Sequence, residues 1–190
     1  AETQRVAVAS GRITMTAEIA GARLPIQIDI GFGDAVTPAV LEINYPSLLD
    51  MPAPRLRAYP PETVVAEKFQ ALVALGMLNS RMKDFFDLWA ISETFAFDGS
   101  ILADAIAATF DRRHTTIPVE TPVALTPAFA EDAAKRAQWQ GFLRRTALSI
   151  APGSFVEMQT KVSAFVLPPV QSLVVDKPLE CKWVVGGPWK

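Results

Sequence analysis

At residues 59–69 the chain reads Tyr59-Pro60-Pro61-Glu62-Thr63-Val64-Val65-Ala66-Glu67-Lys68-Phe69, and strand-like patterning gives way to helical patterning here. Proline in the first turn and Glu62 beside the positive end of the helix dipole are typical of a helix start. Apolar side chains then recur on one face as far as Leu75, and glycine, here Gly76, is a common helix terminator. The pattern predicts a helix from Pro61 to about Gly76.

The residues before this helix have the two-residue period of β-strands. Apolar and polar side chains alternate over Ile13–Ile19 and again over Leu24–Ile30, with a turn signal at Ala20-Gly21 between them. A shorter β-prone run covers Arg5–Ala9. Three meandering strands are the simplest interpretation, and Pro25 favours the start of a strand or an edge position.

Beyond residue 30 the prolines at positions 46, 52, 54, 60 and 61 exclude a long helix before position 60, and a short strand is expected over Leu41–Tyr45. Helical signals dominate the remainder. The expected helices run from Asn79 or Ser80 to about Phe95, from Gly99 to about Arg112 with Asp98 as cap, from Ala128 to about Ser149 with a break near Asp132, and from a cap at Ser154 to a stop before Pro168-Pro169.

These patterns predict an α+β fold, with a partial β-sheet over about residues 1–45 followed by a helical C-terminal part. Three parts are expected along the chain: a sheet subdomain at 1–58, a helical subdomain at 59–170, and a tail at 171–190 that shows no clear period.

Composition excludes several classes of protein. The chain has 190 residues, is 50% hydrophobic and has a formal net charge of −2, which argues against disorder and against binding nucleic acid mainly by charge. No run approaches the roughly 18 apolar residues of a transmembrane helix, and Ala1–Arg5 does not resemble a signal peptide. The single cysteine, Cys181, fits a reducing cytoplasm. With one histidine, His114, metal chemistry would rest on carboxylates and favour magnesium or manganese.

Asp29 is the first candidate for a chemical role. It lies between Ile28 and Ile30, and strand alternation places it on the face opposite to theirs. One interpretation is an exposed carboxylate on the wet face of a meander. The other is a carboxylate that lines a cleft, because Gly31 and Gly33 would let a ligand approach closely.

A second candidate group spans two helices. Lys68 lies in the first helix. Arg81, Asp84 and Asp87 follow at intervals of three along one side of the next. One interpretation is a solvated face with ordinary ion pairs, Arg81–Asp84 and Lys83–Asp87, worth a few tenths of a kcal/mol each. The other is an ionic functional site.

Two further basic segments are less specific. Arg112-Arg113-His114 follows a predicted helix and fits either a phosphate contact or a basic helix end that complements the dipole. Arg144-Arg145 could form a local basic patch that the net charge hides.

Three of these segments together resemble a known family. Gln27-Ile28-Asp29-Ile30, followed by Gly31-Phe32-Gly33-Asp34, is similar to the family's second motif. The lysine helix at 59–69 and the R-x-K-D-x-x-D-L helix at 81–88 are similar to its third. The pattern is that of the AbiEii/AbiGii toxin family of nucleotidyltransferase-like proteins, and the resemblance covers roughly residues 20–190.

The resemblance implies a nucleotidyltransferase-like sheet with helices, in a toxin of a two-gene toxin–antitoxin or phage-abortive-infection system. Members are described as binding a nucleoside triphosphate with a divalent metal, Mg²⁺ or Mn²⁺, and some transfer nucleotides to tRNA ends. Carried over, Asp29 would ligate metal, and Lys68 would contact the triphosphate. Arg81 would position phosphate or hold the aspartates, and Asp84 and Asp87 would support the site, one of them directly. The implied partners are a nucleoside triphosphate, an RNA (tRNA) or protein acceptor, and a cognate antitoxin protein.

One family motif has no counterpart in this chain. The first motif, Gly-Ser followed by D-x-D, carries the main metal ligands, and the chain has no acid pair at a spacing of two. We therefore expect an N-terminally truncated member that is inactive or weak alone. The first alternative is a non-catalytic module that binds nucleotide or antitoxin. The second is a structural or regulatory α+β domain whose charged helices are merely solvated.

Overall fold

A computed structural model of the chain describes residues 10–47, 49–146 and 153–190. The chain divides into two compact units, Ala1–Asp34 and Ala35–Lys190. Short antiparallel sheets and a majority of helix among its regular elements confirm the predicted α+β class.

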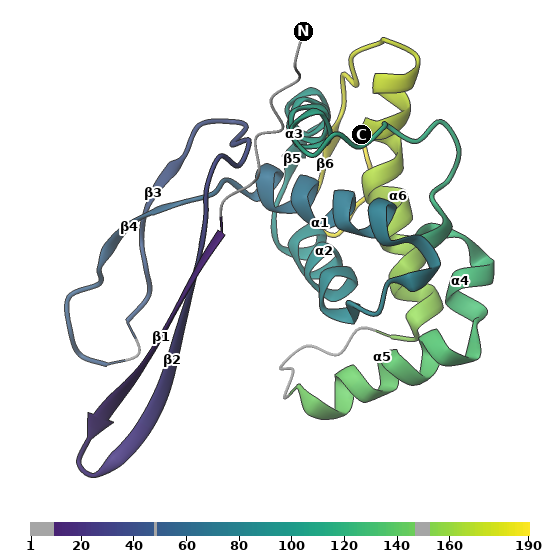
Figure 1. Cartoon of the computed structure of the whole chain (residues 1–190). Helices are drawn as coiled ribbons and strands as arrows, with labels where there is room; N and C mark the ends of the chain where they lie inside the picture. The colour runs from purple at the N-terminus through teal and green to yellow at the C-terminus, as the bar shows by residue number, and fades with distance from the viewer. Residues whose placement is uncertain (1–9, 48, 147–152) are drawn as a thin grey trace, which may run out of the picture. The chain divides into compact units, whose positions relative to one another are not determined.

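The first unit contains a β-hairpin of β1 (Ser10–Ile19) and β2 (Ala22–Gly31), drawn in purple in Figure 1. The residues between the strands, Ala20 and Gly21, both have positive φ, at 49° and 83°, as a two-residue type I′ turn requires. Two of the three predicted strands and the turn between them are thus confirmed. The third prediction, Arg5–Ala9, lies outside the described residues.

The pairing register gives the hairpin one apolar and one polar face. Ile13 opposes Ile28, and Met15 opposes Ile26. The large apolar side chains of this face are 36–63% exposed, so no core within the described residues buries them. The polar face carries the pair Arg12–Asp29.

The second unit begins with a small sheet, in which β3 (Leu41–Asn44) pairs with β4 (Arg55–Ala58). The expected strand near Leu41 is confirmed, whereas β4 was not anticipated. Four residues flanked by prolines carry too little pattern, and pairing with β3 fixes them as a strand.

Six helices follow among the described residues, joined by two short 3-10 turns and a pair of two-residue strands. They are α1 (Pro61–Leu75), η1 (Gly76–Leu78), α2 (Met82–Thr94), β5 (Phe97–Asp98), α3 (Gly99–Arg112), η2 (Val123–Leu125), α4 (Pro127–Glu131), α5 (Ala133–Arg145), α6 (Phe155–Val174) and β6 (Lys182–Trp183). None of the described helices is long and apolar enough to cross a membrane.

Most helix ends follow the predicted caps. α1 ends at Gly76, and the Asp98 carboxylate accepts hydrogen bonds at the start of α3. Asp132 has extended backbone between α4 and α5, which confirms the break there. α2 starts at Met82, later than predicted, and the predicted end near Ser149 lies outside the described residues.

α6 contradicts the predicted stop, because it continues through Pro168 and Pro169 to Val174. A proline cannot donate to the carbonyl four residues earlier, so Pro169 leaves the Phe165 carbonyl without its helical donor. The Trp189 indole N–H donates to that carbonyl at 3.1 Å. The C-terminal tail therefore supplies a donor to the Phe165 carbonyl, and the helix can continue past the two prolines.

The compact units divide after Asp34, and the subdomain boundaries expected at residues 58 and 170 stay predictions. Thr37 lies in the second unit, where its backbone N–H donates to Thr63 Oγ1 and its carbonyl accepts from the same hydroxyl. The tail belongs to the same unit, since Trp183 is buried and donates to the Ser92 carbonyl.

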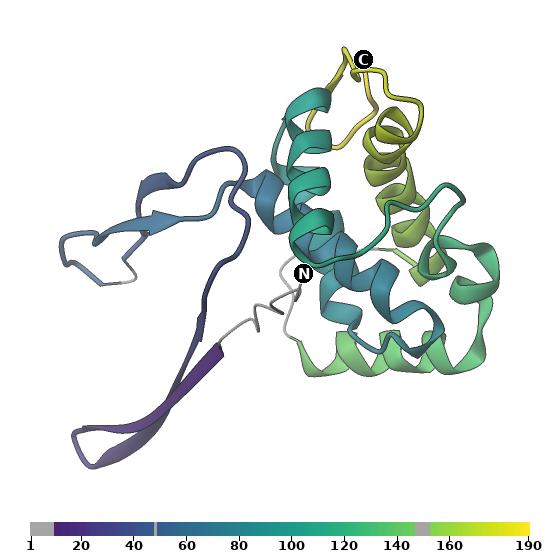
Figure 2. The ribbon, with the colours of Figure 1, turned by 45° about the horizontal axis from the view of Figure 1, so that its top comes forward.

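The hydrophobic core lies among α1, α2, α3 and α6, and α5 runs across the end of the bundle where α6 begins (Figures 1 and 2). Aromatic side chains dominate this core, the largest fully buried ones being Phe69, Phe85, Phe110, Phe129, Trp139 and Phe165. Rigid packing of this kind holds the polar side chains at the edge of the core, on α1 and α2, in fixed positions.

The cap of α3 yields a stability prediction. Replacing Asp98 by alanine should lower the free energy of unfolding by about 1 kcal/mol, because the backbone N–H groups of Ser100 and Ile101 lose their acceptor. The hydroxyl of Ser100 and the N–H of Ile101 lower the pKa of Asp98 in the folded protein. The stabilisation is therefore present above about pH 4, the unfolded carboxyl pKa, and is lost as pH falls through the folded value.

Urea unfolding of wild type and Asp98→Ala from pH 7 to pH 3 measures both effects. Asp98→Asn keeps a capping acceptor without titrating, so it should stay near the wild type at pH 7. An unchanged midpoint for Asp98→Ala at pH 7 would refute the capping role.

Candidate functional site

The packing of α1 against α2 brings the predicted cation and carboxylates together. Lys68 Nζ lies 2.5 Å from Asp87 Oδ2 and 3.3 Å from Asp84 Oδ1. Lys68 precedes Phe69, which is fully buried, and the lysine side chain itself is only 19% exposed. Its ammonium is therefore held between two carboxylates at the edge of the core.

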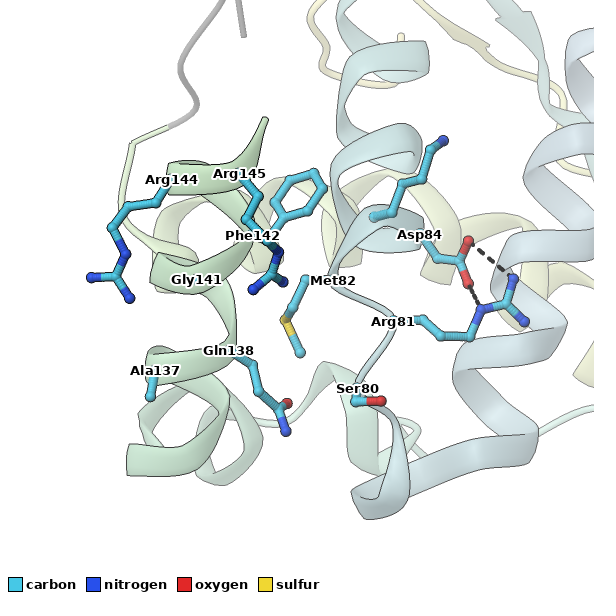
Figure 3. A pocket seen from close by; sticks show the side chains of 11 residues that line it. Ser80, Arg81, Met82, Asp84, Ala137, Gln138, Gly141, Phe142, Arg144 and Arg145 are labelled. Carbon is cyan, nitrogen blue, oxygen red and sulfur yellow. Dashed lines mark hydrogen bonds and ion pairs between the residues drawn. The ribbon is translucent and has the colours of Figure 1, made fainter. Parts of the chain in front are cut away.

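Asp84 is the buried centre of the group, at 3% exposure. Arg81 Nε lies 2.7 Å from Asp84 Oδ2, and Arg81 Nη2 donates to Oδ1 at 3.3 Å (Figure 3). The contact to Oδ2 is an ion pair that lacks hydrogen-bond alignment. Asp84 thus bridges a partly buried lysine and an arginine whose side chain is 58% exposed.

Asp87 links the same lysine to a second, exposed one. Lys83 Nζ lies 2.5 Å from Asp87 Oδ2, on the side of α2 facing solvent. The ionic cluster, defined as Lys68, Arg81, Lys83, Asp84 and Asp87, therefore has three cations and two carboxylates. Two of its pairs, Arg81–Asp84 and Lys83–Asp87, are the ordinary ion pairs expected for a solvated helix face. Lys68 contacts both carboxylates and so joins the two pairs into one group.

The turn before α2 is fixed by two side chains. The Asn79 side-chain oxygen accepts the backbone N–H of Arg81 at 2.8 Å, which starts the helix at the right place for Arg81 and Asp84. The Asn79 carbonyl accepts from Lys135 Nζ at 2.8 Å, and this buried ammonium lies 5.0 Å from the centre of the Phe129 ring. Nothing in the sequence singles out Lys135, because its partner is 56 residues away.

Asp29 lies in the first unit, on the polar face of the hairpin. It accepts from Arg12 Nε at 2.6 Å and from Gln27 Nε2 at 2.8 Å, and its side chain is 58% exposed. The hydrogen bond from Arg12, followed by that from Gln27, lowers the pKa of this carboxyl. The surroundings of Asp29 in its own unit are those of a carboxylate on a wet strand face.

The described residues do not form a complete divalent-metal site. They contain no group of three or more His, Cys, Asp or Glu side chains placed to hold one ion. In the ionic cluster both carboxylates are already paired with cations, which suits an anion better than a metal. Of the other basic candidates, Arg113 pairs with Glu67 on α1 at 2.6 Å.

A family model matches the chain over residues 2–161: the nucleotidyl transferase AbiEii toxin of type IV toxin–antitoxin systems. No curated protein and no solved structure matches the chain. The matched span includes the hairpin, the lysine helix α1 and the whole ionic cluster. A toxin of this kind is one half of a two-component system, so an antitoxin is its partner. The chain belongs to the AbiEii family of nucleotidyltransferase-like toxins of type IV toxin–antitoxin systems.

Proposed function

We propose that the chain binds a nucleoside triphosphate at the ionic cluster and serves transfer of its nucleotide to an RNA acceptor such as tRNA, with a protein acceptor as the alternative. The observation that supports this is the convergence of Lys68, Arg81 and Asp84 from two helices on one partly buried point. In keeping with these substrates, we also propose that the protein acts in the cytoplasm and that its role is in phage defence.

The charge balance of the cluster favours an anionic ligand. Three cations face two carboxylates, so one positive charge is left over. Arg81 and Lys83 are more than half exposed and can swing toward a phosphate. Lys68 supplies a fixed point charge, and Arg81 supplies a planar fork that binds phosphate oxygens in pairs.

The two aspartates receive different roles. Lys68 and Arg81 engage both oxygens of the buried Asp84, so we assign Asp84 to positioning these two cations. Among the described residues, both partners of Asp87 contact its Oδ2 atom, and we assign Oδ1 to accept a proton. The acceptor hydroxyl loses its proton to Asp87 as its oxygen bonds to the α-phosphorus, and pyrophosphate leaves.

The proposal includes Mg²⁺ or Mn²⁺ as cofactor, with Asp29 as a ligand, on the strength of family resemblance. The described residues bring no three possible ligands together around one point, so no step is assigned to a metal here. We expect transfer by this chain alone to be slow or undetectable. This same shortage of ligands favours the second candidate function, a nucleotide- or antitoxin-binding module without catalysis.

A transfer assay with protein in excess over acceptor separates these functions. Each α-³²P-labelled nucleoside triphosphate is incubated with total tRNA and magnesium, using wild type, Lys68→Ala and Asp87→Asn. Slow but detectable label transfer that disappears in both variants is the result expected for the transferase. Nucleotide binding without transfer supports the binding module. Transfer that persists in both variants, or neither binding nor transfer by the wild type, would overturn the proposed site.

A further inference from the structure

The ionic cluster borders a second feature, a cavity of about 790 Å³ between the start of α2 and α5. We name it the α2–α5 groove; residues 80–84 form one wall, and residues 137–145 contribute the other. We propose that this groove binds the phosphate backbone of RNA. The inference rests on the proposed function, since the strand it would hold is the acceptor.

The charges that line the groove fit a polyanion. Four of its residues are cationic, Arg81, Lys83, Arg144 and Arg145, and its one acid is Asp84. The charge of Asp84 is already matched within the ionic cluster. A chain with a net charge of −2 thus concentrates positive charge at this one place.

Helix α5 itself supports the same conclusion. It carries four basic residues and no acidic one between Ala133 and Arg145. In the part of the chain that the structure describes, no carboxylate pairs with Arg144 or Arg145, both of which are exposed. Their charges are therefore available to a ligand.

The shape of the groove allows a backbone to come close. Figure 3 shows Gln138 and Arg145 reaching into the space between α5 and the segment before α2, while Arg144 extends outward. The α5 wall carries the small residues Ala137 and Gly141. The Arg145 guanidinium lies over Gly141, because a Cβ at that glycine would be 3.4 Å from Arg145 Nη1.

RNA fits this arrangement better than an acidic protein segment does. Cationic residues line both walls of an open groove, as a strand with a charge at each nucleotide requires. No large apolar side chain of the lining is exposed, so the groove offers a peptide no large apolar anchor. Arg81 and Asp84 belong to both the groove and the ionic cluster, so a strand in the groove lies beside a triphosphate at Lys68.

The test is fluorescence anisotropy of a labelled 12-nucleotide RNA, titrated with the full chain without nucleotide across a range of salt. Arg144→Gln/Arg145→Gln should bind roughly tenfold to a hundredfold more weakly at low salt, and the salt slope should fall by about 1.4, or about 0.7 for each lost phosphate contact. Arg136→Gln removes one positive charge from α5 outside the groove lining and should bind nearly as the wild type does.

Gly141→Leu provides a variant that keeps every charge. Leucine has a higher helix propensity than glycine, so α5 should remain folded while the side chain displaces Arg145 and narrows the groove. Weakened RNA binding by this variant, with an unchanged melting temperature or a higher one, is the expected result.

The outcomes separate this inference from the proposed function. Lys68→Ala should lose nucleotide binding and keep RNA binding if both are correct. Unchanged RNA affinity in Arg144→Gln/Arg145→Gln overturns the groove even where nucleotide binding is intact. Competition by polyglutamate as strong as that by RNA also overturns it, in favour of an acidic protein partner.

Discussion

Asp84→Ala should lower the free energy of unfolding by about 3 kcal/mol, because removing one partner of a buried ion pair leaves the other charge uncompensated. Asp84 is 3% exposed and contacts Lys68, whose side chain is 19% exposed. The contribution from Arg81 is smaller, since that side chain is mostly in water. The measurement is urea unfolding at pH 7.

Two further variants make this prediction specific to the lysine. Asp87→Ala should cost about 1 kcal/mol, because one of its two lysines is exposed. Lys68→Met removes the stranded ammonium, so Asp84→Ala should cost less in that background, with a coupling of about 1–3 kcal/mol. Equal costs of Asp84→Ala in the two backgrounds would show that Asp84 does not hold Lys68.

Phe85→Ala should cost about 4 kcal/mol, within the range for deleting a fully buried aromatic ring. Phe85 is 0% exposed, and its ring centre lies 5.6 Å from that of Phe129 and 5.3 Å from that of Phe155. The change removes the contacts that fix α2 against α4 and α6, one residue from Asp84. Thermal and urea unfolding measure the loss.

Phe95 is the matched control for Phe85. It follows α2 directly and is 45% exposed, so its replacement by alanine should change the free energy of unfolding by about 0.5 kcal/mol or less. Similar losses for the two substitutions would contradict the core placement of Phe85.

Local sequence signals predicted those parts of the fold that local chemistry determines. Gly21 and Gly76 need conformations that glycine adopts easily, and Asp98 and Asp132 cap helices with their own side chains. The strand β4 and the course of α6 depend on partners elsewhere in the chain. Trp189 lies 24 residues from Phe165, so no window around Pro168-Pro169 reveals that the helix continues.

The candidate site likewise has one part that local sequence predicts and another that depends on distant contacts. The spacing of Arg81, Asp84 and Asp87 along one helix face follows from the helical period. In the structure Arg81 pairs with Asp84, and Asp87 pairs with Lys68 and Lys83. The entry of Lys68 between the carboxylates depends on how α1 packs against α2, which periodicity does not give. In the sequence, only the resemblance to a toxin family indicates that Lys68 acts together with the two aspartates.

The proposed function depends most on binding of a nucleotide's phosphates by the ionic cluster. Isothermal titration of the folded chain with GTP and with CTP, each with and without magnesium, tests it most directly. Lys68→Ala should weaken binding by at least about tenfold, which is what losing one charged contact of about 1.4–3 kcal/mol implies.

Lys161→Ala is the matched control in that titration. Lys161, on α6, is a half-exposed lysine that pairs with one carboxylate, Glu93, and is not part of the ionic cluster. We expect wild type and Lys161→Ala to bind a nucleoside triphosphate with equal affinity, and Lys68→Ala to bind it more weakly. Equal binding by all three proteins, or binding by none of them, would overturn the assignment of the ionic cluster as the nucleotide site.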